Sequence, residues 1–237
     1  MDCSFYKIEH LNRMSKVFYK PIQTFRSIAE NCSKADWLLP TVILTVLSLS
    51  SSWFTRPIVE SARDAIIESQ LLHFSVEQKE SVLEIREAAR SIGFLLSPIL
   101  YFFILFVVGT VLFGLNKLLY GMASYEQVIA IYAYSSLIDA VKLLIITPII
   151  ISENTLDVHI GFGLLLSEQV SQTFIGHVIY NIDLFDIWQV LVVSIGLAVI
   201  GQISKRKTLG TVLGLWFIWL ILNAFLANTI TSIMSQR

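Results

Sequence analysis

The sequence has little charge. Only 15% of its 237 residues are Asp, Glu, Lys or Arg, whereas about a quarter are charged in a typical soluble domain, and 55% are hydrophobic. A soluble fold needs polar residues to cover its surface, so this composition argues against an ordinary soluble enzyme and against a disordered chain. Two cysteines are too few for a disulfide-stapled mini-protein, and a net charge of −1 gives no basic excess for binding nucleic acid.

The familiar catalytic signatures are also missing. The sequence contains no His-Glu-x-x-His, no Gly-x-Ser-x-Gly, no phosphate-binding Gly-x-x-x-x-Gly-Lys-[Ser/Thr] and no Cys-x-x-Cys. Asp157, His159, Glu168 and His177 fall in one connection, but their spacing fits no established metal motif. We therefore predict that the chain is not an enzyme and has no catalytic residue, metal site or cofactor.

The charges that are present are clustered, and the gaps between them are long. A helix of about 20 apolar residues crosses a hydrocarbon core of roughly 30 Å, and apolar segments in lipid must be helical to satisfy their backbone amides. We predict an all-α membrane protein, with a cytoplasmic amphipathic segment at 1–36 and a membrane domain at 37–233 that includes an extramembrane helical hairpin at 56–91. The domain is a bundle of five transmembrane helices, at roughly 37–55, 92–116, 127–151, 185–204 and 209–233.

The distribution of Lys and Arg predicts the orientation of these helices, because basic residues accumulate in cytoplasmic loops. Lys117 and the three residues at 205–207 lie in links that the five-span topology places on the N-terminal side, and no Lys or Arg occurs between Lys142 and Lys205. This pattern predicts a cytoplasmic N-terminus, an external C-terminus and an external, re-entrant or surface-lying connection at 152–183. The first 36 residues hold six basic residues: Lys7, Arg13, Lys16, Lys20, Arg26 and Lys34.

The N-terminal segment has apolar residues at three- and four-residue steps, which is typical of an amphipathic helix. A second short helix is expected to begin at Pro21. Two interpretations stay open at this point: the segment lies in the cytoplasmic lipid interface, or it packs on the protein's own cytoplasmic face. The apolar positions are Phe5, Ile8, Leu11, Met14 and Phe18, followed by Ile22, Phe25 and Ile28.

Asp139 and Lys142 are the two charged residues well inside a predicted span. Such residues are expensive in a membrane, and they indicate function by default. At positions i and i+3 they share one helix face and can neutralise each other, so an ion pair within the helix is favoured over an ion or proton pathway.

Four segments, in order over residues 20–220, resemble the Yip family of integral membrane proteins. The likeness implies a five-span helical bundle with a cytoplasmic N-terminus, and a prokaryotic-type member in the bacterial cytoplasmic (inner) membrane. The chain departs from the family pattern at two places. Met122 stands where the family has Lys, and Ile138-Asp139 follow Ser136-Leu137 where the family often has Pro. The segments are Pro21 to Phe25 with Trp37 to Pro40; Gly121 to Tyr125; Ala130 to Leu137, which includes Tyr134; and Asp183-Leu184-Phe185-Asp186-Ile187-Trp188 with Gly196, the basic turn at 205–207 and Leu213 to Trp216.

The scarcity of candidate catalytic residues and motifs favours a non-enzymatic scaffold or accessory protein that binds membrane partners or organises lipid. Its expected partners are membrane lipid and other membrane proteins or a second copy of the chain, and not nucleic acid. Gly210 and Gly214 form a Gly-x-x-x-Gly that permits a close helix crossing, or are simply two glycines in a membrane helix. The alternative function is a small transporter or channel that uses Asp139 and Lys142.

Overall fold

Helices make up the regular structure in a computed structural model of the chain, which describes residues 3–71, 76–156, 158, 160–165, 170 and 173–235. Within these residues the only strand-like pairing is an isolated bridge between Gly161 and Asp183, so the predicted all-α class is confirmed. In chain order the elements are α1 Cys3–Lys16, α2 Pro21–Glu30, α3 Lys34–Leu71, α4 Val76–Leu118, α5 Tyr125–Ser135, α6 Leu137–Glu153, the 3-10 helix η1 Phe162–Leu165, α8 Phe174–Tyr180, α9 Leu184–Ile200 and α10 Lys205–Ser235.

Four helical segments among the described residues are long and apolar enough to cross a membrane. The predicted fourth span corresponds to α9, whose 17 residues extend only about 25 Å at 1.5 Å per residue. The chain is therefore a multi-pass membrane protein by the length and composition of its helices, and the count of five spans stays a prediction. The four segments are Lys34–Ala62, Leu96–Leu118, Tyr125–Glu153 and Lys205–Leu226.

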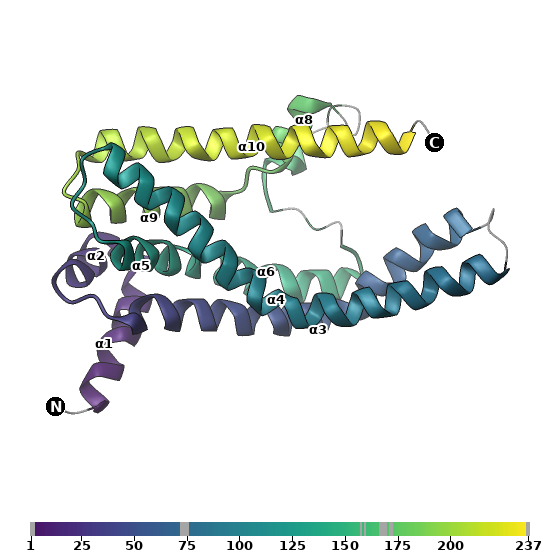
Figure 1. Cartoon of the computed structure of the whole chain (residues 1–237), viewed down its shortest axis with the longest axis horizontal. Coiled ribbons are helices and arrows are strands. Elements are labelled where there is room, and N and C mark those ends of the chain that lie inside the picture. Colours follow the sequence, from purple (N-terminus) through teal and green to yellow (C-terminus); the bar gives the residue numbers. More distant parts are fainter. Residues whose placement is uncertain are drawn as a thin grey trace.

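The predicted insertion at 56–91 is occupied by continuations of α3 and α4. Neither helix stops at the predicted end of its span, and both extend away from the N-terminal helices (Figure 1). The turn that would join them falls at 72–75, outside the described residues, so the helical hairpin stays a prediction.

The predicted third span is interrupted at Ser136, which separates α5 from α6. Its hydroxyl donates to the carbonyl of Tyr132 at 2.9 Å, and such back-bonding by serine bends helices. The amide of Asp139 then bonds to the carbonyl of Ser136, three residues back, at 3.0 Å. This tightened turn breaks the regular hydrogen-bond pattern, which the uniform apolar stretch did not predict.

The links between the helices lie at two opposite ends of the molecule. The N-terminal helices, the α4–α5 link and the α9–α10 link gather at one end, on the left of Figure 1, whereas α8 and the C-terminus lie toward the other. The segments that the basic residues assigned to one side of a membrane are therefore neighbours in space. This arrangement agrees with the predicted grouping and leaves open which side is cytoplasmic.

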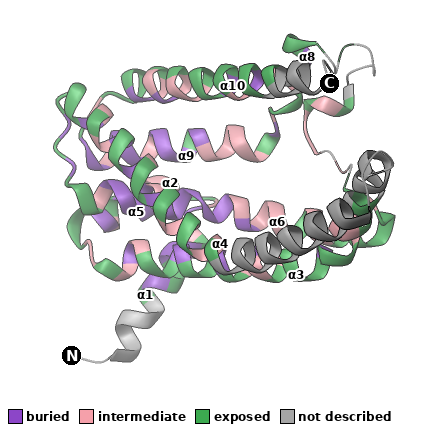
Figure 2. Ribbon diagram, turned by 45° about the vertical axis from the view of Figure 1, so that its right-hand side comes forward, coloured by how far each residue is buried: buried purple, intermediate pink, exposed green. Residues whose placement is uncertain are grey.

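The hydrophobic core lies where α2, α5 and α9 meet (Figure 2). Phe25 and Ile28 of α2 are completely buried there, as are Ile131 and Tyr134 of α5. Of the two interpretations of the N-terminal segment, the structure therefore shows α2 packed on the protein itself. Leu11 of α1 is 56% exposed, so part of the segment's apolar surface is left uncovered.

Candidate functional site

Asp36 is the centre of a buried polar network at the start of α3. Its side chain is completely inaccessible, and its Oδ2 accepts hydrogen bonds from the backbone N and the Oγ of Ser33, at 2.9 and 3.0 Å. The spacing Ser33-x-x-Asp36 is that of a helix-capping box, which explains why α3 begins here rather than at the first apolar residue. The start of α3 thus fixes the position of this carboxylate.

The other carboxylate oxygen of Asp36, Oδ1, contacts three side chains from distant parts of the chain. Arg13 Nη1 donates to Oδ1 at 2.9 Å, Tyr134 Oη donates at 3.0 Å, and Nδ1 of His10 lies 3.1 Å away. All three side chains are at least nine-tenths buried. We call these four residues, with Ser33, the Asp36 network. It joins α1, α3 and α5 at a single carboxylate.

Arg13 uses all five of its N–H groups in this network and around it. Besides Asp36 it donates to Glu9 Oε1 at 2.6 Å, to the Oγ and carbonyl of Ser27 at 3.0 and 3.3 Å, and to the carbonyl of Asn31 at 3.1 Å. Burial acts to lower the pKa of Arg13, but the hydrogen bond and charge of Asp36 outweigh it and raise that pKa. The charge is fully accommodated, so the network suits fastening helices better than reacting with a ligand.

Sequence reasoning missed this network. It counted Arg13 only as a charge that sets topology, and it identified Tyr134 only through the family resemblance. Two local signals were present: the Ser33-x-x-Asp36 spacing, and the placement of Arg13 beside the apolar Met14 on an otherwise amphipathic helix. Neither signal names Tyr134 as the partner, which lies 98 residues from Asp36.

Asp139 and Lys142 do not pair with each other among the ion pairs that the structure describes. Lys142 Nζ instead contacts the carboxylate of Asp183 and lies 3.7 Å from Asp186 Oδ1, so it joins α6 to the start of α9. Asp139 Oδ2 accepts a hydrogen bond from Gln189 Nε2 at 2.8 Å, also on α9. The expected pair within one helix is therefore replaced by two contacts between helices.

Asp183 has a second role as the N-cap of α9. Its Oδ1 accepts a hydrogen bond from the backbone N of Asp186 at 2.8 Å, while its Oδ2 contacts Lys142. One carboxylate thus begins the helix and fixes it to α6.

Three of the four residues that suggested a metal site in 152–183, namely Asp157, His159 and Glu168, lie outside the described part of the chain. Within the described residues there is no group of three side chains that could hold a metal ion.

Two glycines mark the closest approaches of the chain. A Cβ on Gly196 of α9 would lie 2.5 Å from Cγ2 of Ile131 and 3.1 Å from the ring of Phe25, so only glycine lets α2, α5 and α9 meet. A Cβ on Gly121 would lie 2.0 Å from Oδ1 of Asn116, a buried residue whose amide donates to the carbonyl of Gly121 at 3.3 Å. By contrast, Gly210 and Gly214 have nothing within 4 Å of an added Cβ.

The sequence model of one protein family, the Yip1 domain, matches residues 15–226, which is most of the chain. The chain belongs to the Yip1 domain family. Neither the curated proteins nor the solved structures gave a match. The family match begins at Ser15 and ends at Leu226, so it takes in every helix from α2 to α9 and the larger part of α10.

The Yip-type positions that the sequence singled out serve the packing of this Yip1 domain. Pro21 begins α2, and Pro40 is buried within α3. Phe185 and Trp188 of α9 are partly buried against the core, and the Trp188 ring meets the ring of Phe18 edge-on at 5.9 Å. Phe25, Tyr134, Gly121, Asp183 and Gly196 lie in the contacts between helices described above.

Cys32, between α2 and α3, is expected to react slowly with thiol reagents. Burial, and the nearby charge of Asp36, raise the pKa of this thiol to about 11, whereas an unperturbed cysteine has a pKa of about 8.5. Because the thiolate is the reactive form, Cys32 at neutral pH should label roughly 300-fold more slowly than an exposed cysteine. Maleimide labelling of a Cys3→Ser variant in mild detergent measures this rate.

The control for this labelling is Ser15→Cys in a chain lacking both natural cysteines, because Ser15 is exposed. The rate at Cys32 should rise as the pH approaches the raised pKa, and it should match the control once the protein is unfolded. Equal rates for the two folded proteins at neutral pH would contradict this account of the Cys32 environment.

Proposed function

We propose that this Yip1 domain protein is a non-enzymatic integral membrane scaffold or accessory protein, which binds other membrane proteins or a second copy of itself through its outer helices. The observation that carries the proposal is the large apolar surface of α4 and α10. Only 17% of the residues in the most apolar stretch of each helix are buried. Large side chains on these faces, such as Phe103 and Trp219, are 63% and 62% exposed.

The described polar residues near the membrane region support this role over transport. Lys142, Asp139 and Asp183 each have a partner on another helix, and the Asp36 network uses every donor of Arg13. A transport pathway needs polar groups that are free to exchange partners, so these contacts favour a structural role for them. The alternative, a transporter or channel based on Asp139 and Lys142, is not favoured.

The proposed location is the bacterial cytoplasmic membrane, with the N-terminus inside and the C-terminus outside. Its support is the excess of Lys and Arg in segments that gather at the end of the molecule where the N-terminal helices lie (Figure 1). A reporter fused to the C-terminus tests this orientation, and a cytoplasmic signal from that reporter would overturn it.

Photo-cross-linking in native membranes tests the scaffold proposal. A photoreactive phenylalanine analogue replaces Phe103 of α4 or Trp219 of α10, both on the exposed faces. The matched control is Phe113, also on α4, whose ring packs edge-on against Tyr125 with centroids 5.4 Å apart. We expect a defined protein adduct from position 103 or 219 and none from position 113. Adducts with lipid alone at both test positions would contradict the proposal.

A further inference from the structure

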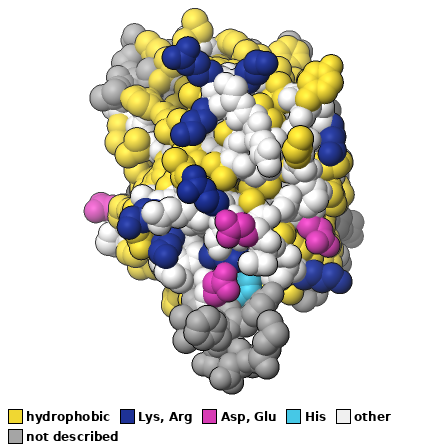
Figure 3. Space-filling view, turned by 90° about the vertical axis from the view of Figure 1, so that its left-hand side faces the viewer, with side chains coloured by type: hydrophobic (Ala, Val, Ile, Leu, Met, Phe, Trp, Pro, Cys, Tyr) yellow, Lys and Arg dark blue, Asp and Glu magenta, His cyan; other side chains and the backbone are white. Residues whose placement is uncertain are grey.

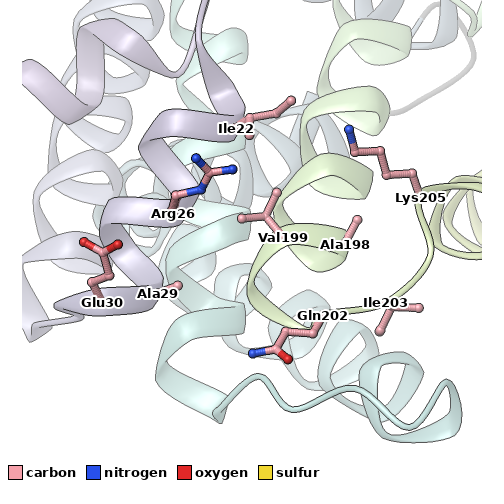
Figure 4. A pocket seen from close by; sticks show the side chains of 9 residues that line it. All are labelled: Ile22, Arg26, Ala29, Glu30, Ala198, Val199, Gln202, Ile203 and Lys205. Carbon is pink, nitrogen blue, oxygen red and sulfur yellow. The ribbon is translucent and has the colours of Figure 1, made fainter.

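A groove of about 460 Å³ lies between α2 and the α9–α10 link (Figure 4). Its apolar wall is formed by Ile22 of α2, Val199 of α9 and Ile203 of the link. The groove opens at the end of the molecule that carries the N-terminal helices and most of the basic links. It is separate from the Asp36 network and from the contacts of Lys142.

Two cations face this groove from opposite walls. Arg26 projects from α2 and Lys205 from the first residue of α10, and both side chains extend into the gap, whereas the carboxylate of Glu30 is turned away from them (Figure 4). Among the described residues, neither cation has an acidic side chain within ion-pair distance or a hydrogen-bond partner. Two like charges facing one gap leave a positive potential that an anion would neutralise.

The surroundings add to this positive potential and bring apolar surface to it. Lys205 begins α10, so the positive end of a long helix dipole lies at the same place. Arg206 and Lys207 follow it, and both are exposed. Figure 3 shows Lys and Arg side chains spread among hydrophobic ones over this end of the molecule.

We propose that the groove binds the phosphate of an anionic phospholipid from the leaflet on the N-terminal side, with Arg26 and Lys205 contacting the phosphate. Basic pockets between membrane helices are suited to anionic lipid headgroups. The wall of Ile22, Val199 and Ile203 favours a lipid over free phosphate, because it offers apolar contact to the glycerol and first acyl carbons. The inference rests on the proposed membrane location but needs no protein partner.

Native mass spectrometry of the full chain in detergent tests this assignment, with phosphatidylglycerol and phosphatidylcholine of the same acyl chains as probes. A basic residue near an anionic headgroup contributes roughly a factor of five in affinity, so R26Q/K205Q should bind phosphatidylglycerol about 25-fold more weakly than the wild type. The charge-preserving R26K/K205R should bind within about threefold of the wild type. Phosphatidylcholine should bind the wild type weakly and be insensitive to either change.

The matched control is R206Q/K207Q, which removes two positive charges from the first turn of α10, next to Lys205, without altering the groove lining. Equal losses in the two glutamine variants would show unspecific attraction and overturn the proposal. Equal binding of the two lipids would overturn it as well, as would displacement of phosphatidylglycerol by excess inorganic phosphate, which would assign the groove to free phosphate. Lipid selectivity without any protein cross-link would support this inference and contradict the scaffold proposal alone.

Discussion

An Asp36→Ala substitution is expected to lower the free energy of unfolding by about 3–5 kcal/mol and to release α1 from the bundle. The substitution removes the acceptor for Arg13 and Tyr134 and the contact of His10, and it leaves the Arg13 charge buried without its main partner. Removing one member of a buried ion pair typically costs this much, because the remaining charge is desolvated and uncompensated. Thermal unfolding in detergent and the rate of tryptic cleavage after Arg13 measure the two effects.

The control for this experiment is Glu126→Ala, which removes an exposed carboxylate from the first turn of α5 and should cost less than about 1 kcal/mol. A double-mutant cycle separates the ion pair from general disruption. R13M/D36L leaves neither charge in the interior, so it should be less destabilised than either single change. Strictly additive losses would show that Arg13 and Asp36 do not stabilise each other.

A Gly196→Ala substitution is expected to lower the free energy of unfolding by about 1–3 kcal/mol, because the added methyl group overpacks the core. The new Cβ would lie 2.5 Å from Cγ2 of Ile131, which is completely buried, so that side chain or its helix must shift. An Ile131→Ala change in the same chain removes the clashing atoms, so the pair should be less destabilised than the sum of the two single changes.

Gly210→Ala provides the matched control for Gly196, since both glycines lie in apolar helices and nothing comes within 4 Å of a Cβ at Gly210. This variant should unfold within about 1 kcal/mol of the wild type, on the stable side, because alanine favours helix more than glycine does. A Gly196→Ala protein as stable as the Gly210→Ala protein would mean that α2, α5 and α9 do not meet as closely as described.

The apolar helices could be predicted from the sequence because membrane insertion follows a local rule. Stretches with few charges identify candidate spans wherever they are about 20 residues long, and α3, α4, α5–α6 and α10 obey this rule. α9 is shorter than a full span because Asp183 caps its start and Gly201 ends it after 17 residues. The apolar stretch continues to residue 204, so hydropathy alone does not detect this end of the helix. Hydropathy also contains no information on the Ser136 turn, which depends on a side-chain hydrogen bond.

The polar contacts could not be predicted because they join residues that are distant in the sequence. The i, i+3 spacing of Asp139 and Lys142 suggested a pair within one helix, yet Lys142 contacts Asp183, which is 41 residues away and offers a better placed carboxylate at a helix terminus. Tyr134 reaches Asp36 only because α5 packs beside α3. Such pairings follow from the arrangement of helices, which a single sequence does not specify.

The structure thus separates two kinds of residue in this Yip1 domain. The described charged residues at Arg13, Asp36, Lys142 and Asp183 hold helices together, whereas the exposed surface of α4 and α10, through which we propose that a partner binds, is mostly apolar. A substitution in the first group should reduce the amount of folded protein. A substitution such as Phe103→Ala in the second group should leave folding intact and weaken association.

The mass of the complex extracted directly from native membranes into polymer-bounded lipid discs tests the scaffold proposal most directly, because this procedure keeps neighbouring proteins and lipid in place. We predict that the chain is recovered in a defined assembly with another membrane protein or a second copy, and that Phe103→Ala or Trp219→Ala reduces this assembly without lowering the amount of folded chain. Recovery of the wild-type chain only as a single copy surrounded by lipid would contradict the proposal.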